Sequence, residues 1–256
     1  MENVCLITED KVNIALNYYK NGHDEVVIVA PGWCMTKDSN AFEQICEIFT
    51  ESFDVISFDF RGHGKSGGMY TFTAKELMDL DAVVNFARKN EYKKIYLAGF
   101  SLGAALSLIY ASQNPVVDKI IAISAPTDFD KIENQMWRKE AWGETFKKFE
   151  LDRFASIRPY PIPLKKIKPV DIIDKINADT LFIAGEKDPT IHPWHTKELF
   201  EKAVCRKKYK EYKNGCHAED LFLHFKDDFS QVCLDWLKNS DKNSAVLNDK
   251  ETVQIC

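Results

Sequence analysis

Residues 95–109 read IYLAGFSLGAALSLI, in which a short glycine-containing segment separates two apolar runs. The pattern predicts a strand, a sharp turn and a helix, with Ser101 at the turn. A nucleophile on such a turn sits in strained backbone geometry and needs small neighbours two positions away. Gly99 and Gly103 meet this requirement. Ser101 is therefore the first candidate for a reactive hydroxyl, although the bare pattern Gly-x-Ser-x-Gly also occurs in turns without chemistry.

Short apolar runs alternate with longer amphipathic stretches along the rest of the chain. We expect strands at 26–30, 55–59, 95–100, 120–123, 181–184 and 208–212, and helices at 39–50, 74–89, 101–112, 194–203 and 218–238. Such alternation predicts a mostly parallel sheet with helices on both faces. Two antiparallel edge strands, 4–8 and 12–19, precede it. Functional groups are then expected beyond the carboxyl ends of the parallel strands.

The alternation also predicts how the chain is divided. Residues 1–125 and 169–238 form the α/β core, interrupted by a cap insertion at 126–168. The insertion is rich in aromatic residues, and its composition fits either a lid over the site or a pair of ordinary surface helices. Residues 239–256 are polar and aperiodic, which predicts a disordered tail.

Composition limits the classes of function. A net charge of −5 over 256 residues, with only short basic clusters, argues against nucleic acid as a partner. Seven widely spaced cysteines without a Cys-x-x-Cys pair indicate a reducing compartment. The sequence predicts no signal peptide, and it contains no apolar run of about 18 residues. We therefore expect a cytoplasmic protein without an integral membrane segment; its oligomeric state is left open.

Ser101 needs a base and an acid, because a serine hydroxyl is a poor nucleophile near neutral pH. Asp188 follows a predicted strand, and His217 lies in the loop before the last predicted helix. The chain order Ser, Asp, His is the order expected for this kind of sheet. Asp128 and Asp130 are rivals for the acid, because they follow the strand at 120–123 and face the same edge.

The developing oxyanion of an acyl-transfer reaction needs fixed N–H donors. Leu102, directly after the candidate nucleophile, offers one backbone N–H, and Trp33, in the turn after the strand at 26–30, offers the other. The segment Gly64-Lys65-Ser66 is not a phosphate loop, because Asp59 stands where that motif requires glycine. We expect this glycine-rich loop to pass close beneath the catalytic turn. Scattered histidines and cysteines predict neither a metal nor a cofactor.

These residues together resemble an α/β-hydrolase of the carboxylic-ester hydrolase type, over roughly residues 10–238. The motifs that carry the resemblance are Gly32-Trp33, Asp59-x-Arg61-Gly62-His63-Gly64-x-Ser66, Gly99-Phe100-Ser101-Leu102-Gly103, Gly185-Glu186-Lys187-Asp188 and Cys216-His217-Ala218-Glu219. The resemblance implies Ser101 as nucleophile, Asp188 as acid, His217 as base, and Trp33 and Leu102 as oxyanion donors. The insertion looks like the small caps of cinnamoyl or feruloyl esterases and of monoacylglycerol-lipase-like enzymes. Pro31 and Cys216 depart from the family pattern, which usually has histidine and glycine there.

The sequence thus predicts a serine hydrolase that cleaves a small-molecule carboxylic ester through an acyl-serine intermediate, with no cofactor and no metal. A thioesterase, an acyltransferase and a serine peptidase share this chemistry up to the leaving group. A non-catalytic binding module on the same fold is the alternative from a different class, because fold alone does not fix function.

Overall fold

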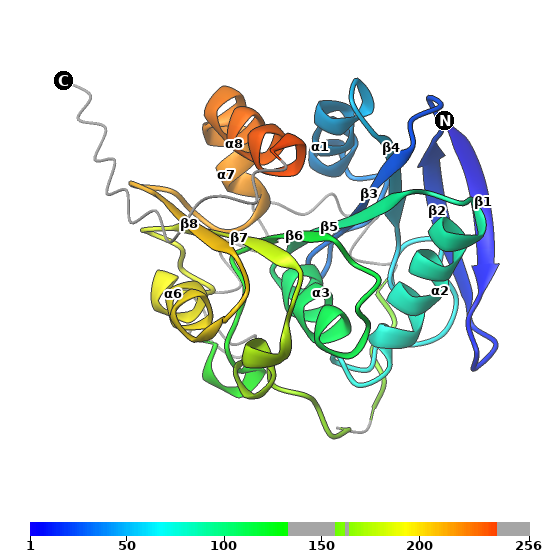
Figure 1. Ribbon diagram of the computed structural model, residues 1–256. Helices are drawn as coiled ribbons and strands as arrows, with labels where there is room; N and C mark the ends of the chain where they lie inside the picture. Colours follow the sequence, from blue (N-terminus) through cyan, green and yellow to red (C-terminus); the bar gives the residue numbers. More distant parts are fainter. Residues whose placement is uncertain (133–156, 162–163, 240–256) are drawn as a thin grey trace.

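The computed structural model describes residues 1–132, 157–161 and 164–239. The described residues form one eight-stranded sheet in the order β1-β2-β4-β3-β5-β6-β7-β8 (Figure 1). The strands are β1 (Glu2–Ile7), β2 (Asn13–Tyr19), β3 (Glu25–Ala30), β4 (Asp54–Phe58), β5 (Lys94–Phe100), β6 (Lys119–Ile123), β7 (Asp179–Gly185) and β8 (Lys207–Tyr212). The helices are α1 (Asn40–Thr50), α2 (Glu76–Lys89), α3 (Leu102–Gln113), α6 (Pro193–Lys202), α7 (Glu219–His224) and α8 (Lys226–Lys238).

Strands β3 to β8 run parallel, and the β1–β2 hairpin adds two antiparallel strands at one edge, as predicted. Strand β3 lies between β4 and β5, so the chain leaves β3 toward one side and then returns to the other. Ligands bind at such a reversal, outside the carboxyl ends of the strands. The turn that follows β5, with Ser101, lies at this point of the sheet.

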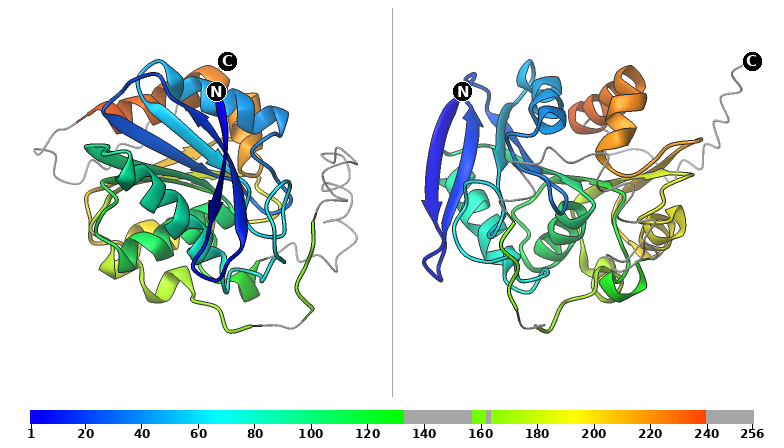
Figure 2. Two further views of the ribbon diagram at one scale, coloured as in Figure 1. Left: turned by 90° about the vertical axis from the view of Figure 1, so that its right-hand side faces the viewer. Right: turned by 180° about the vertical axis from the view of Figure 1, so that it is seen from behind.

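Helices cover both faces of the sheet: α2, α3 and α6 lie on one face, and α1, α7 and α8 on the other (Figures 1 and 2). Alternate residues of β3 divide between the two cores. Val26 and Ile28 pack in the core under α2, α3 and α6, while Val27 and Val29 pack under α1, α7 and α8. A strand buried on both faces reads as a continuous apolar run, which is why the sequence pattern identified the central strands.

One predicted helix is wrong. The stretch 218–238 is two helices, because the backbone breaks at Phe225, which has φ −125° and ψ 36°. The ring of Phe225 lies 4.9 Å from that of Tyr212 in β8. The apolar spacing continues across the break without glycine or proline, so the pattern carried no signal of it.

Most of the predicted cap and tail falls on residues 133–156, 162–163 and 240–256, which lie outside the described residues. The described parts of 126–175 hold three short 3₁₀ turns that the pattern did not predict, Phe129–Lys131, Pro169–Asp171 and Ile173–Lys175. Residues 157–161 run beside the segment after β4, where Tyr70 pairs with Pro159.

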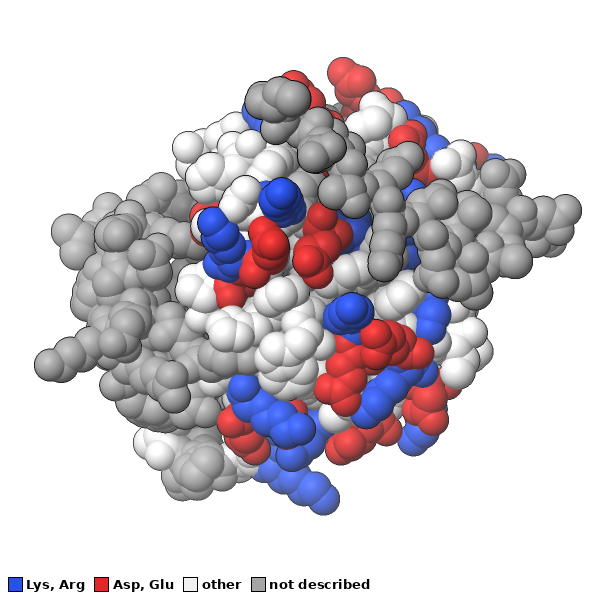
Figure 3. Space-filling model, turned by 90° about the vertical axis from the view of Figure 1, so that its left-hand side faces the viewer, with Lys and Arg blue, Asp and Glu red and all other residues white. Residues whose placement is uncertain are grey.

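Charge on the surface beside β8 and α6 is mixed. Figure 3 shows acidic and basic side chains interspersed over the described part of this face. Arg206 pairs with Asp179 at 2.7 Å, and Lys202 pairs with Glu198 at 2.7 Å. Within the described residues, every helix is too short or too polar to cross a membrane.

Candidate active site

Ser101 occupies the sharp turn between β5 and α3 with φ 51° and ψ −109°, a conformation that L-residues rarely adopt. Its two glycine neighbours are required by close contacts. A Cβ on Gly99 would lie 2.5 Å from the carbonyl oxygen of Gly103, and a Cβ on Gly103 would lie 2.1 Å from the carbonyl oxygen of Ala30. Helix α3 can therefore start directly against β3 and β5 only because both positions lack a side chain.

Three side chains predicted from the sequence meet in a hydrogen-bonded chain. His217 Nε2 lies 3.0 Å from Ser101 Oγ, and His217 Nδ1 lies 2.7 Å from Asp188 Oδ2. The side chain of Asp188 is fully buried, whereas that of His217 is 15% exposed. The three residues come from the carboxyl ends of β5, β7 and β8, which are brought together by the order of the sheet. This is the arrangement in which a base activates a hydroxyl and a carboxylate orients the base.

Asp188 is held in its ionised form. Its Oδ1 atom accepts hydrogen bonds from the backbone N–H groups of Thr190 and Ile191, at 2.9 and 2.8 Å. Burial opposes ionisation, but the charge and hydrogen bond of His217 and the two N–H donors outweigh it, and the pKa of Asp188 lies below its usual value. An ionised Asp188 accepts a hydrogen bond from Nδ1–H of the neutral imidazole, so the proton of Ser101 can pass to Nε2.

Of the two rival acids, Asp128 is paired with a lysine and Asp130 is exposed. Asp128 Oδ2 lies 2.6 Å from Lys168 Nζ, and its Oδ1 accepts from the backbone N–H of Asp130. Burial opposes ionisation of Asp128, but the hydrogen bond from Lys168, the backbone N–H of Asp130 and the charge of Lys168 together outweigh it and lower the pKa of Asp128. The structure thus brings Asp188, and not Asp128, to His217.

The two expected N–H donors belong to the residues that follow Gly32 and Ser101 in the chain. A Cβ on Gly32 would lie 3.5 Å from Ser101 Cβ, which places the turn that contains Trp33 against the serine. Leu102 N–H belongs to the first turn of α3, where N–H groups have no partner within the helix. Among the described residues, the Trp33 N–H donates no hydrogen bond. The carbonyl oxygen of Pro31 lies near Gly103, where an added Cβ would meet it at 2.7 Å.

The loop that carries His217 contains Cys216 at the position where the family resemblance leads us to expect glycine. The positive φ angles of this loop fall at Asn214 and Ala218, so residue 216 needs no glycine. The crowded position is instead Gly185, where a Cβ would lie 2.2 Å from the carbonyl oxygen of Cys216. Sequence reasoning did not single out Ser124, whose hydroxyl accepts a hydrogen bond from Ala218 N–H at 3.1 Å.

The glycine-rich loop after β4 does not make the contact that was expected of it. Gly64 lies against the carboxylate of Asp59, and Gly62 lies against Tyr70 and the carbonyl oxygen of Arg158. The glycines that closely approach the catalytic turn are Gly32, Gly99 and Gly103. The glycines of this loop therefore allow its backbone to pack closely around Asp59 and Tyr70.

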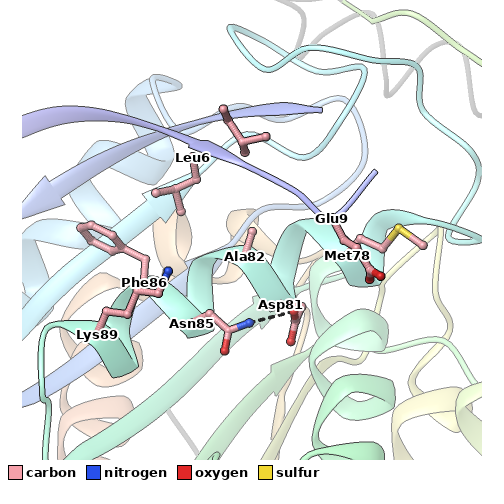
Figure 4. A pocket seen from close by; sticks show the side chains of 9 residues that line it. Leu6, Glu9, Met78, Asp81, Ala82, Asn85, Phe86 and Lys89 are labelled. Carbon is pink, nitrogen blue, oxygen red and sulfur yellow. Dashed lines mark hydrogen bonds between the residues drawn. The ribbon is translucent and has the colours of Figure 1, made fainter. Parts of the chain in front are cut away.

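A surface cavity of about 440 Å³ lies between β1 and α2 (Figure 4). Its walls are formed by Leu6, Ile7, Glu9, Met78, Asp81, Ala82, Asn85, Phe86 and Lys89. None of these residues belongs to the hydrogen-bonded chain. Within the described residues, no three histidine, cysteine or acidic side chains gather in a way that could hold a metal ion.

A mostly parallel sheet with a serine on the turn after β5, and with an acid and a histidine after β7 and β8, defines an α/β-hydrolase fold. The chain belongs to the alpha/beta hydrolase fold family, whose model matches residues 25–156. The human serine hydrolase BPHL is 24% identical over 91% of this chain and 87% of its own. Lysophospholipase L2 of Escherichia coli is 29% identical over 41% of this chain and 33% of its own.

Solved structures share the fold over nearly the whole chain. An esterase of Pyrococcus furiosus superposes with a TM-score of 0.76 at 24% identity, covering 93% of this chain and 91% of its own. An esterase of Exiguobacterium antarcticum superposes with a TM-score of 0.71 at 18% identity, covering 93% of this chain and all of its own. At these identities the likeness establishes the fold.

Proposed function

We propose that this protein hydrolyses a carboxylic ester through an acyl-serine intermediate, with Ser101 as nucleophile, His217 as base and Asp188 as the orienting acid. The observation that carries the proposal is the continuous chain of contacts from Ser101 Oγ to His217 Nε2, 3.0 Å, and from His217 Nδ1 to Asp188 Oδ2, 2.7 Å. Family membership and the esterases among the similar structures support the same class of reaction.

In the first half of the reaction, Ser101 Oγ attacks the ester carbonyl carbon while His217 Nε2 takes the hydroxyl proton. The negative charge that develops on the carbonyl oxygen is stabilised by the N–H groups of Trp33 and Leu102. The ionised Asp188 stabilises the imidazolium. The tetrahedral intermediate then collapses, the bond to the alcohol breaks, and His217 Nε2–H gives its proton to the leaving oxygen.

In the second half, water takes the place of the alcohol. His217 removes a proton from water, the hydroxide oxygen attacks the acyl carbon, and the same two N–H groups stabilise the second oxyanion. The proton on His217 returns to Ser101 Oγ as the acyl bond breaks and the carboxylic acid leaves. The cycle uses only side chains and backbone groups of this chain, so the proposal includes no cofactor.

The substrate is proposed to be a small-molecule ester, and residues 126–168 are proposed to act as the cap of the acyl site. The cytoplasm is the proposed location, which the unpaired state of all six described cysteines supports.

The test is hydrolysis of p-nitrophenyl esters from acetate to palmitate by the wild-type protein and by Ser101→Ala, together with a matched thioester and a matched anilide. We expect the variant to lose the activity of the wild type. We also expect the ester to be cleaved faster than the thioester and the anilide. Full ester hydrolysis by Ser101→Ala would contradict the proposal. Faster cleavage of the thioester would instead indicate a thioesterase, and faster cleavage of the anilide would indicate a peptidase. No turnover by a folded wild type would favour a non-catalytic binding module.

A further inference from the structure

Two successive residues at the carboxyl end of β6 each hold one partner of the Ser101–His217 pair. The carbonyl oxygen of Ile123 accepts a hydrogen bond from Ser101 N–H at 2.8 Å. The hydroxyl of Ser124 accepts one from the N–H of Ala218, the residue after His217, at 3.1 Å. Strand β6 lies between β5 and β7 (Figure 1), so it connects the nucleophile turn to the side of the sheet that carries the base.

The Ser124 hydroxyl fixes the peptide group next to His217. The carbonyl oxygen of this peptide, on His217, accepts from Asp220 N–H at 3.0 Å, and its N–H, on Ala218, donates to Ser124. The bond to Asp220 lies within the turn and moves with it. The bond to Ser124 ties the turn to the sheet. Rotation of this peptide would swing the imidazole away from Ser101, and a small misplacement of a catalytic group costs much of the rate.

Ser124 is itself held rigidly. It is fully buried, its N–H donates to the carbonyl oxygen of Ile183 in β7 at 2.8 Å, and its φ is 49°. Ala218, at the other end of the bond, is also fully buried and has φ 47°. Non-glycine residues at positive φ persist only where their surroundings determine the conformation, and such residues cluster at functional sites.

We propose that Ser124 is a positioning residue for the reaction: its hydroxyl holds the His217–Ala218 peptide so that His217 Nε2 faces Ser101 Oγ. Ser124 acts through His217 and does not itself take part in bond making or breaking. The inference rests on the proposed function for its kinetic consequence, while its structural consequence can be measured without any substrate.

Two substitutions separate positioning from general stability. Ser124→Ala and Ser124→Gly both remove the acceptor, but only glycine adopts the positive φ without steric strain. We expect both variants to lower kcat by about 10- to 100-fold with KM changed less than about twofold, since binding of the ester does not depend on the base. We expect the melting temperature of Ser124→Gly to be at least as high as that of Ser124→Ala.

A matched control removes an equally buried hydroxyl from the opposite end of the sheet. Thr180, at the start of β7, is fully buried and donates to the carbonyl oxygen of Ala178 at 2.9 Å. Thr180→Val should leave kcat and KM close to those of the wild type, even where it lowers the melting temperature. A wild-type kcat for Ser124→Gly would overturn the proposal. So would losses of kcat that parallel the decrease in melting temperature across all three variants.

Proton NMR gives a readout that needs no turnover. The His217 Nδ1 proton, shared with Asp188, should give a resolved downfield resonance in the wild type and in Thr180→Val. In both Ser124 variants it should be shifted or broadened by exchange. An unchanged resonance in Ser124→Gly would overturn the positioning role. A wild type that shows this resonance but hydrolyses no ester would refute the proposed function alone, and the response of the resonance would still decide the role of Ser124.

Discussion

Asp188 Oδ2 lies 2.7 Å from His217 Nδ1, while Asp188 Oδ1 is occupied by the backbone N–H groups of Thr190 and Ile191. One carboxylate oxygen is therefore fixed by the chain, and the other is aimed at the imidazole. This division of roles means that Asp188 can be altered at one oxygen without releasing the loop that carries it.

Asp188→Asn should preserve the fold and nearly abolish turnover. The amide oxygen can still accept from the two N–H groups, but the amide nitrogen then faces Nδ1 and forces the wrong tautomer of His217. We expect kcat to fall by about 10⁴-fold, as for the equivalent change in other triads. The measurement is kcat on p-nitrophenyl acetate, with circular dichroism to check the fold.

Asp128→Asn is the matched control for this change, because Asp128 was one of the two rival acids and pairs with Lys168 instead. Its kcat should stay within about threefold of the wild-type value, because Asp128 lies outside the hydrogen-bonded chain of Ser101, His217 and Asp188, even where loss of the pair between the buried Asp128 and Lys168 lowers stability. Equal losses in the two variants would contradict the assignment of Asp188.

Gly103→Ala should destabilise the fold, whereas Gly32→Ala should not. A methyl group at Gly103 would lie 2.1 Å from the carbonyl oxygen of Ala30, so α3 and β3 must separate; at Gly32 the nearest atoms lie at 3.5 Å. We expect Gly103→Ala to lower the free energy of unfolding by about 1–3 kcal/mol or more, and Gly32→Ala by less than about 1 kcal/mol. Urea denaturation measures both changes in the free energy of unfolding. Similar changes for the two variants would contradict the close packing of α3 on β3.

His63 makes stability depend on pH. Burial lowers the pKa of His63 from its ordinary 6.5 to about 4, while its Nδ1–H donates to the carbonyl oxygen of Arg61. In the unfolded chain His63 binds a proton below about pH 6.5, whereas in the folded chain it does so only near pH 4. Between these values the unfolded state binds more protons, so the stability of the fold decreases as pH falls from 6.5 toward 4 and is unaffected by His63 above pH 6.5. The shift corresponds to about 3 kcal/mol. Urea denaturation of the wild type across this range measures it.

His63→Asn keeps an N–H donor near the same position and does not titrate. It should be less stable than the wild type at pH 8 because the ring is lost from the core. Its stability should fall less steeply between pH 6.5 and 4. A variant with the full wild-type pH dependence would show that another group causes the loss.

Cys34, next to Trp33, should resist thiol reagents. Its side chain is buried, and burial raises the pKa of the thiol, which keeps the reactive thiolate scarce. Cys5 is exposed on the edge strand β1. One equivalent of iodoacetamide at pH 8 should modify Cys5 before Cys34 and leave ester hydrolysis intact, as peptide mapping by mass spectrometry would show. Early modification of Cys34 with loss of activity would contradict this.

The strands and the hydrogen-bonded chain could be predicted because each rests on a local pattern. Strands β3, β5, β6 and β7, which are buried over all or nearly all of their length, read as apolar runs, and Gly99 and Gly103 indicated close packing around Ser101. Asp188 and His217 were found by their places after strands and by their order. The fold class and the antiparallel hairpin were confirmed in the structure.

The remaining features depend on contacts between distant residues. Nothing local separates Asp188 from Asp128 and Asp130 as the candidate acid, because all three follow a strand. The structure separates them by which loop reaches His217. Ser124 is an ordinary serine after an apolar strand, and its bond to Ala218 spans 94 residues. The break at Phe225 depends on packing against Tyr212, which the helical spacing of α7 and α8 does not encode.

The most direct test of an activated Ser101 is labelling with a fluorophosphonate probe, in which the serine oxygen displaces fluoride from phosphorus. The labelled protein is digested and the adduct is located by mass spectrometry in wild type, Ser101→Ala and Asp188→Asn. We predict an adduct on Ser101 in the wild type, none in Ser101→Ala, and much slower labelling in Asp188→Asn. A folded wild type that takes up no probe at Ser101, or a Ser101→Ala variant labelled as fast as the wild type, would contradict the account.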